Sequence, residues 1–252
     1  MILLLDIGNT RIKWGGLIGG EFQAGSALPR GGGDVAKMID AVQAKQYRPA
    51  RVIVSNVAQD QYRDLLASEV DRRWGCQVEF VATLASAFGV VNGYEEPQLL
   101  GVDRWLALIA ARQVADGALC VVDCGTALTV DLLTREGEHL GGMIVPGVGL
   151  MQEALVNNTE GLNEASEWST KEGALLMARN TADAISGGAH YSLMALIDRV
   201  ASDAREPLGE DLSVVLTGGD AKTLKTHLRC DTLFEPDLVL KGLAIVAEAA
   251  ER

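Results

Sequence analysis

The sequence contains no apolar run long enough to cross a membrane. The longest apolar stretch, 140–151, falls short of the roughly 18 residues that a bilayer requires, and glycine and proline interrupt it. The first apolar residues follow no basic segment and give way to Asp6, which predicts a first strand and not a signal peptide. We therefore expect no transmembrane helix, no membrane partner and a cytoplasmic location.

Cysteine and histidine are also scarce. The four cysteines form no C-x-x-C pair, and the three histidines lie at no ligand spacing from Cys120 and Cys124. A zinc site that uses these two cysteines with a histidine is the alternative to ordinary buried thiols. Reduced thiols are favoured, because they are the usual state of cysteine in a cytosolic protein.

Positively charged residues are outnumbered by negatively charged ones, 22 to 34, and the familiar phosphate-binding motifs are missing. The net charge is −12, which argues against nucleic acid as a partner because that binding depends on clustered cations. Neither a Walker A sequence nor a G-x-G-x-x-G turn after a strand is present, and the glycine run 31–33 predicts a flexible connection. Any phosphate must therefore be bound by local groups elsewhere.

The remaining pattern is that of a folded α/β protein, with 48% hydrophobic residues and alternating strand and helix signals. A glycine-rich connection is expected after the second strand, before residue 34. For the first half, the pattern predicts strands at 2–5, 11–17, 51–57 and 77–81, and helices at 34–45, 61–73 and 102–115.

The second half restarts at Ala118 with the same plan. A hairpin turn is expected at 136–138, and a further strand follows it. The segment 141–147 is explained equally well as a ligand loop and as a structural bend. The pattern predicts further strands at 128–133 and 212–216, and helices at 171–186, at 190–204 and from 240 onward. The fold is expected to contain two duplicated halves, 1–115 and 116–252, with helices covering mixed sheets.

Two loops repeat one another across these halves. In each, an apolar strand ends in Asp-x-Gly and a small polar residue, at Asp6 and at Asp123. A carboxylate beside closely approaching backbone can bind a cation and the oxygens of a polyphosphate. The first loop adds Asn9, Thr10 and Lys13 as phosphate contacts. An ordinary strand end explains either loop equally well when it is taken alone, and Lys13 alone is explained as a solvated lysine.

A third constellation, Gly101-Val102-Asp103-Arg104-Trp105, begins a predicted helix. The helix dipole alone favours an aspartate there, by about 0.3–1 kcal/mol. The functional alternative is that Asp103 orients a substrate hydroxyl while Arg104 binds a substrate carboxylate. Thr217-Gly218-Gly219 ends a further strand and is a candidate nucleoside contact.

Taken in order, these motifs resemble those of the type III pantothenate kinases, within the acetate and sugar kinase, Hsp70 and actin superfamily. The resemblance covers most of the chain, from residue 6 to about 220. Single motifs are shared across the superfamily, and the Gly-x-Asp-Arg-Trp element at 101–105 narrows the resemblance to this family.

The resemblance implies two ribonuclease-H-like halves with the active site between them, and a homodimer whose substrate pocket borders the subunit interface. It implies that Asp103 accepts the proton and that Asp123 binds a monovalent cation, potassium or ammonium. Magnesium would accompany ATP near Asp6. The implied ATP contacts are Asp6, Ile7, Gly8, Asn9, Thr10, Arg11, Ile12, Lys13 and Thr126. The implied pantothenate contacts are Tyr94, Gly101, Val102, Asp103, Arg104 and, from the partner subunit, Thr181.

The expected activity is ATP-dependent phosphorylation of pantothenate to 4′-phosphopantothenate, the first step of coenzyme A biosynthesis. Alternatives within the superfamily are another small-molecule kinase, such as a sugar or acetate kinase, and a phosphatase that acts on phosphoanhydrides. A non-catalytic nucleotide-binding transcriptional accessory factor could also use this fold. Asp103 and Arg104 together favour the enzyme, because a regulator needs nucleotide contacts but no substrate base.

Overall fold

The computed structural model describes residues 1–31, 34–45, 47–57, 60–159 and 177–250. The predicted connection 31–33 and the predicted helix 171–186 fall partly outside these ranges. By their contacts the described residues form two compact units, one of 1–113 with 237–252 and the other of 114–236. The predicted halves 1–115 and 116–252 concern duplication of the sequence and stay a prediction.

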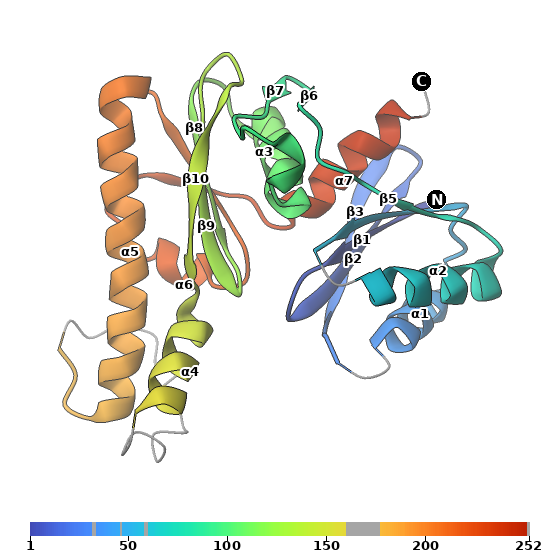
Figure 1. Ribbon diagram of the computed structural model, residues 1–252, viewed down its shortest axis with the longest axis horizontal. Helices are drawn as coiled ribbons and strands as arrows, with labels where there is room; N and C mark the ends of the chain where they lie inside the picture. The colour runs from blue at the N-terminus through green and yellow to red at the C-terminus, as the bar shows by residue number, and fades with distance from the viewer. Residues whose placement is uncertain (32–33, 46, 58–59, 160–176, 251–252) are drawn as a thin grey trace. The chain divides into compact units, whose positions relative to one another are not determined.

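Unit 1 is a five-stranded sheet with helices on both faces (Figure 1). Its elements are β1 (Ile2–Ile7), β2 (Arg11–Ile18), β3 (Glu21–Pro29), α1 (Asp34–Ala44), β4 (Arg51–Asn56), α2 (Asp60–Trp74), β5 (Val78–Phe80), the small strands β6 (Ser86–Ala87) and β7 (Val90–Val91), the 3-10 helix η1 (Pro97–Leu99), α3 (Val102–Val114) and α7 (Leu238–Ala249).

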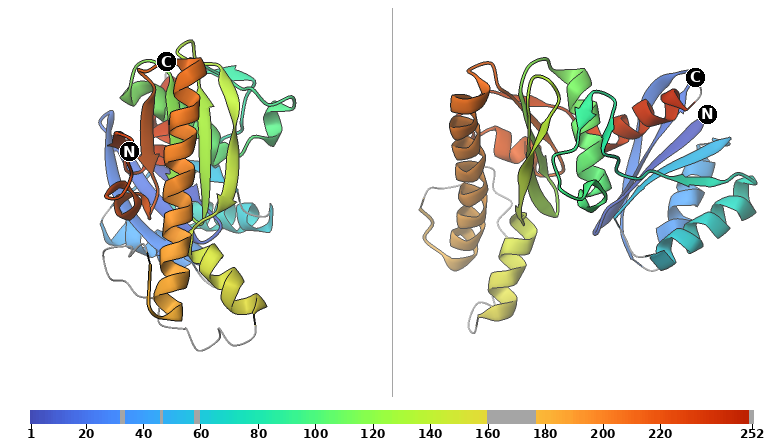
Figure 2. Two further views of the ribbon diagram at one scale, coloured as in Figure 1. Left: turned by 90° about the vertical axis from the view of Figure 1, so that its left-hand side faces the viewer. Right: turned by 45° about the horizontal axis from the view of Figure 1, so that its top comes forward.

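Unit 2 is a second five-stranded sheet, along which the long helix α5 runs (Figure 2). Its elements are β8 (Leu119–Cys124), β9 (Ala127–Leu133), β10 (His139–Pro146), α4 (Val148–Asn158), α5 (Thr181–Leu208), β11 (Ser213–Thr217), α6 (Ala221–Lys225) and β12 (Thr232–Phe234).

The two sheets have the same topology. The strand orders are β3-β2-β1-β4-β5 and β10-β9-β8-β11-β12. In each sheet, the first three strands along the chain are antiparallel neighbours, and the next two join in parallel. In both units the central strand, β1 or β8, is the one that ends in the Asp-x-Gly loop.

The alternation of side chains along a strand explains how unit 1 buries both faces of its sheet. Leu3 and Leu5 of β1 belong to a core that includes Met38 of α1 and Leu66 of α2. Leu4 is also fully buried but points to the opposite face, where helix α7 contacts β1, β2 and β4. Helix α3 packs against α7 so closely that a Cβ on Gly242 would lie 2.3 Å from the carbonyl oxygen of Leu106.

In unit 2, helix α5 covers one face of the sheet. Val122 of β8 and Val214 of β11 pack in one core with Leu193 and Ile197 of α5. The predicted hairpin turn is confirmed, because Thr134 donates its backbone N–H to Glu138 and Gly137 donates back to Thr134. This fold places the half-buried Asp123 near the end of a strand whose other residues are all buried.

Three expectations about local structure are wrong. The predicted connection after β2 contains strand β3, an exposed edge strand with almost no apolar alternation to identify it. Residues 141–146 are part of strand β10, and helix α4 follows with Gly147 at its N-cap. Residues 181–208 form one helix, so no break separates 171–186 from 190–204.

Two local features explain helix α5. It begins at Thr181, because the Asn180 side chain accepts a hydrogen bond of 2.8 Å from the backbone N–H of Asp183 and so caps the helix. The glycines at 187 and 188 each cost about 1 kcal/mol relative to alanine. The buried side of the helix, which includes Leu193 and Ile197, offsets that cost by packing on the sheet.

Candidate active site

The Asp6 loop of unit 1 joins β1 to β2. In the sheet register Asp6 lies opposite Lys13 of β2 and beside Ser55 of β4. Because residues paired across strands point to the same face, Lys13, Asp6 and Ser55 form a row across three strands. Asp6 and Lys13 are half-buried, and Ser55 is fully buried. A carboxylate thus lies between an ammonium and a hydroxyl.

The turn itself is open to solvent. Gly8 donates its backbone N–H to the carbonyl of Arg11 at 3.0 Å, and the residues between them, Asn9 and Thr10, are exposed. Ile7 and Ile12 have no exposed surface and belong to the core. These two residues can therefore contact a nucleotide only through their backbone.

Arg30 fixes this turn and was not identified from the sequence. Its guanidinium donates to the carbonyl of Gly8 at 3.0 Å, and its backbone N–H donates to the carbonyl of Thr10 at 2.8 Å. It also lies 5.3 Å from the ring of Tyr62, within cation–π distance. The local pattern gave no signal, because Arg30 follows the edge strand that the sequence failed to predict.

Asp103 lies in the first turn of helix α3. Its carboxylate accepts a hydrogen bond of 2.8 Å from the backbone N–H of Arg104. A Cβ on Gly101 would lie 2.6 Å from the same carboxylate oxygen. Glycine at 101 therefore leaves room for the Asp103 carboxylate, which is half-buried together with Gly101 and Val102.

Arg104 and Tyr94 lie ten residues apart in the sequence and are in contact in the structure. The Arg104 guanidinium donates to the Tyr94 hydroxyl at 2.7 Å, and Arg104 is only 5% exposed. Asn92 supports the pair, because its side-chain oxygen accepts from the backbone N–H of Tyr94 at 3.0 Å and its amide donates to Pro97 at 3.0 Å. Unit 1 thus brings together Tyr94, Asp103 and Arg104.

The Asp123 loop of unit 2 joins β8 to β9 through a shorter turn. Asp123 lies opposite Thr129 of β9 and beside Thr217 of β11, so Thr129, Asp123 and Thr217 form the row that corresponds to Lys13, Asp6 and Ser55. This row carries no lysine.

Neighbouring segments hold the Asp123 loop from two sides. Gly147 donates to the carbonyl of Thr126 at 2.9 Å, and Asp220 donates to the carbonyl of Cys124 at 3.1 Å. Gly218 has φ +96°, and a Cβ there would lie 2.5 Å from an Asp123 carboxylate oxygen. The Thr217-Gly218-Gly219 turn, predicted as a nucleoside contact, therefore packs directly against the cation-site candidate.

Thr181, the last predicted site residue, is the first residue of α5 and is exposed. Cys120 and Cys124 lie in the core of unit 2. Burial raises the pKa of each thiol to about 12, with nearby carboxylates such as Asp123 adding to the effect at Cys124. In the part of the chain that the structure describes, no three histidine, cysteine, aspartate or glutamate side chains are grouped as a metal ion would need, which does not favour the zinc alternative.

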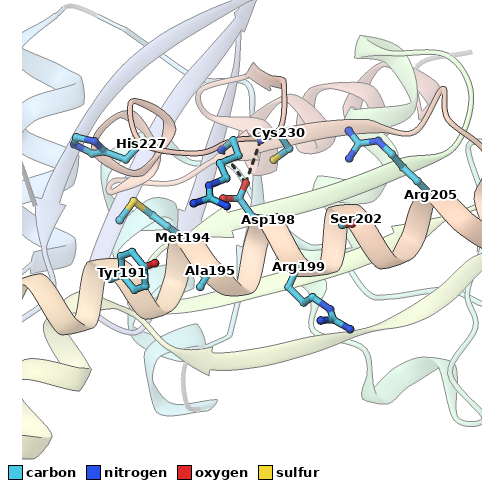
Figure 3. A pocket seen from close by; sticks show the side chains of 10 residues that line it. Tyr191, Met194, Ala195, Asp198, Arg199, Ser202, Arg205, His227 and Cys230 are labelled. Atoms are coloured by element: carbon cyan, nitrogen blue, oxygen red, sulfur yellow. Dashed lines mark hydrogen bonds between the residues drawn. The ribbon is translucent and has the colours of Figure 1, made fainter. Parts of the chain in front are cut away.

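A hollow of about 670 Å³ runs along α5, and none of the residues that line it is a predicted site residue (Figure 3). Asp198 accepts from the backbone N–H groups of Arg229 and Cys230, at 2.9 and 3.1 Å, and so ties this segment to α5. The side chains of Arg199 and Arg205 point in opposite directions in Figure 3. These charged groups do not converge on a ligand.

Comparison with known proteins bears on the alternatives that the motifs left open. A sequence model of the type III pantothenate kinases matches residues 2–203. The chain belongs to the type III pantothenate kinase family. A type III pantothenate kinase from Nitrosococcus oceani is 41% identical, over 98% of this chain and 94% of its own. One from Alkalilimnicola ehrlichii is 39% identical, over 97% of each chain.

Solved structures support the fold independently of the sequence family. A Sinorhizobium meliloti protein described as a 2-dehydro-3-deoxygalactonokinase superposes with a TM-score of 0.63 at 15% identity, covering 99% of this chain and 96% of its own. The likeness is one of fold alone. With the repeated sheet topology, it confirms the predicted α/β class, in which two mixed sheets are flanked by helices. In the described residues, no helix is both long and apolar enough to cross a membrane.

Proposed function

We propose that this protein transfers the γ-phosphoryl group of ATP to the primary hydroxyl of pantothenate, giving 4′-phosphopantothenate. Membership of the type III pantothenate kinase family is the observation that carries the proposal. The structure supports it by placing Asp103 and Arg104, which a nucleotide switch would not need, in an ordered arrangement with Tyr94.

Asp103 is proposed to align the pantothenate hydroxyl and accept its proton. Its oxygen is already oriented by the Arg104 backbone N–H, so the carboxylate is held before substrate binds. Phosphoryl transfer passes through a loose transition state, so alignment and charge neutralisation contribute more than base strength. Arg104 would bind the pantothenate carboxylate, assisted by Tyr94, Gly101 and Val102.

The Asp6 loop is proposed to bind the phosphates of ATP through Asn9, Thr10, Lys13 and the backbone between them. Magnesium fits here, because the Asp6 carboxylate and the buried Ser55 hydroxyl offer the oxygen ligands or water contacts that it prefers. When bound, magnesium neutralises charge on the phosphates. Lys13, in the same row as Asp6, adds a fixed positive charge.

The Asp123 loop is proposed to bind potassium or ammonium, with Thr126 contacting ATP. The donors suit a weakly bound monovalent ion, because Asp123 lies between the hydroxyl-bearing residues Thr129 and Thr217 and no lysine shares the row. The cation, when bound, supplies positive charge near the transferred phosphoryl group. We expect activity to collapse when sodium replaces potassium.

A homodimer is proposed, in which Thr181 of the partner subunit contacts pantothenate. Strand β10 is an edge of its sheet, and it exposes Leu140, Met143 and Ile144 by 55%, 49% and 62%. Apolar groups on an open edge favour burial in an interface. Thr181 itself is exposed at the start of α5, where it is accessible to a partner.

Chromatographic detection of 4′-phosphopantothenate tests the activity. The purified protein with ATP, magnesium and potassium should form this product, and Asp103→Asn should lower turnover by about 10²–10⁴ while ATP still binds. Phosphate release without an acceptor would instead indicate a phosphatase. A panel of sugars and acetate tests the other kinases, and nucleotide binding without turnover on any acceptor would indicate a regulator.

Subunit mixing tests the shared pocket. Asp103→Asn and Thr181→Val homodimers, each of low activity, should regain activity when dissociated and reassociated together, because each mixed dimer holds one site with Asp103 and Thr181 both intact. Asp103→Asn mixed with a second Asp103 variant is the matched control and should stay inactive. No recovery in dimers shown to have exchanged would remove Thr181 from the partner's site.

A further inference from the structure

Ser55 is a fully buried hydroxyl without a protein partner. Its exposure is 0%, and its Oγ atom makes no hydrogen bond to any of the residues that the structure describes. Leaving a polar group buried and unpaired destabilises a protein, by an amount comparable to losing a hydrogen bond. Alanine would fill nearly the same volume at this position without that cost, so packing does not explain the serine.

The position of Ser55 in the sheet offers an explanation. Ser55 pairs with Asp6 in the parallel register between β1 and β4, so both side chains lie on the same face at the ends of their strands. The preceding residue on this face of β4, Ile53, is apolar and only 2% exposed. The hydroxyl thus occurs where the apolar face ends and the proposed phosphate loop begins.

We propose that Ser55 is a positioning residue for magnesium–ATP bound at Asp6, and that its hydroxyl hydrogen-bonds a water molecule of the hydrated magnesium ion. This inference rests on the proposed function and assigns a role to a residue outside the Asp-x-Gly motif. Magnesium retains several of its waters when it binds to proteins, and a hydroxyl can either donate to or accept from such a water. The Ser55 hydroxyl is then unpaired only when magnesium–ATP is not bound.

The substitution Ser55→Ala separates this role from a structural one. Without ligand, the variant should melt higher than the unmodified protein, by about 2 °C, because it no longer buries an unpaired hydroxyl. With magnesium, its affinity for ATP should fall about 3- to 10-fold, the value of one hydrogen bond. In EDTA, the affinity for ATP should not change. Calorimetric titration and thermal melting measure these quantities without any turnover.

Two further variants provide the controls. Ser186→Ala removes the hydroxyl of a buried serine in helix α5 of the other unit, and should leave both ATP affinities unchanged. In an Asp6→Asn background, Ser55→Ala should cause no further loss of magnesium-dependent affinity, because the two residues act on one ligand. Should Ser55→Ala fold poorly, Ser55→Cys, which keeps a similar shape with a slightly larger atom and weakens the hydrogen bond, replaces it.

Equal losses of affinity with magnesium and in EDTA, or no loss in either, would overturn the role of Ser55. A lower melting temperature for Ser55→Ala together with unchanged affinities would assign the hydroxyl to packing. Neither result depends on pantothenate, because only nucleotide binding is measured. Failure of the kinase proposal would appear separately, as an unmodified protein that binds magnesium–ATP but forms no 4′-phosphopantothenate.

Discussion

The Asp-x-Gly loops of the two units occupy the same place in the same topology but have different surroundings. In unit 1 the row across the sheet is Lys13, Asp6 and Ser55. In unit 2 it runs from Thr129 through Asp123 to Thr217. One aspartate therefore has a lysine in the facing position, and the other has a threonine. Under the proposed roles, this cross-strand residue helps to separate the magnesium–phosphate site of unit 1 from the monovalent-cation site of unit 2.

The two loops also differ in how they are held. The unit 1 turn exposes Asn9 and Thr10, and the side chain of Arg30 bonds its first residue. In the unit 2 turn, the backbone N–H groups of Gly147 and Asp220 bond the loop from neighbouring segments. The unit 1 turn therefore leaves polar side chains open to a ligand, whereas backbone donors from two other segments hold the unit 2 turn.

The largest expected effects come from the two aspartates themselves. Asp6→Asn should lower kcat/KM by about 10³ and weaken magnesium–ATP binding, because it removes charge stabilisation at the phosphates. Asp123→Asn should lower the rate and abolish the response to potassium while magnesium–ATP still binds. Steady-state kinetics over a potassium series, with calorimetric nucleotide titration, distinguish the variants. If Asp123→Asn responds to potassium as the unmodified protein does, the two loops do not differ as proposed.

Replacing Thr129, which faces Asp123, with lysine should give unit 2 the lysine–aspartate pair of unit 1. Thr129→Lys places an ammonium opposite Asp123, where it competes with a bound cation. The potassium response should flatten, and activity at saturating potassium should fall about 10- to 100-fold. Thr129→Ser keeps the hydroxyl and should retain the response. A normal potassium titration by Thr129→Lys would show that the cation binds elsewhere.

Adding one methyl group should have very different effects in the turn that packs against Asp123 and in the turn that follows Asp6. Gly218→Ala introduces a Cβ at φ +96° and 2.5 Å from Asp123, and should destabilise the protein by about 3 kcal/mol through backbone strain and the close contact. At Gly8 the nearest atom to a Cβ would be the Arg11 carbonyl oxygen, at 3.3 Å. Gly8→Ala should cost less than about 1 kcal/mol. Urea unfolding measures both, and equal losses would contradict the difference in packing.

The smallest expected effect is the loosening of the unit 1 turn. Arg30→Met removes the charged hydrogen bond to the Gly8 carbonyl, and should raise the KM for ATP about 3- to 10-fold with less effect on kcat. Arg63→Met is the matched control, because Arg63 also lies over an aromatic ring, that of Phe80 at 4.2 Å. Initial rates over a series of ATP concentrations give the KM for ATP and kcat of both variants. A loss of kcat at unchanged KM would remove Arg30 from nucleotide binding.

Strands and turns that depend on the local pattern of apolar residues and glycines could be predicted from the sequence. The apolar runs before Asp6 and Asp123 predicted the central strands, and the glycines after them predicted the turns. Strand β3 was missed because an exposed edge strand needs no apolar alternation. Helix α5 was divided at Gly187 because propensity takes no account of the packing that holds a long helix together.

The site partners that were missed depend on contacts distant in the sequence. Ser55 lies beside Asp6 only because β4 joins β1 in parallel, and Arg30 reaches Gly8 only because β3 returns along β2. Such pairings follow from sheet register, which no single segment encodes. Arg104 was named from its motif and Tyr94 from the resemblance, but only the fold shows the hydrogen bond between them.

Helix α7 has a consequence for the order in which the protein can fold. Unit 2 is one continuous stretch, 114–236, whereas unit 1 needs residues 237–252 to be complete. During synthesis the β1–β5 sheet therefore emerges long before the helix that covers its second face, where Leu4 is fully buried. Unit 2 can therefore fold first, while one apolar face of the unit 1 sheet is still uncovered. A nascent chain stalled before residue 237 should therefore depend on chaperones at its oldest part.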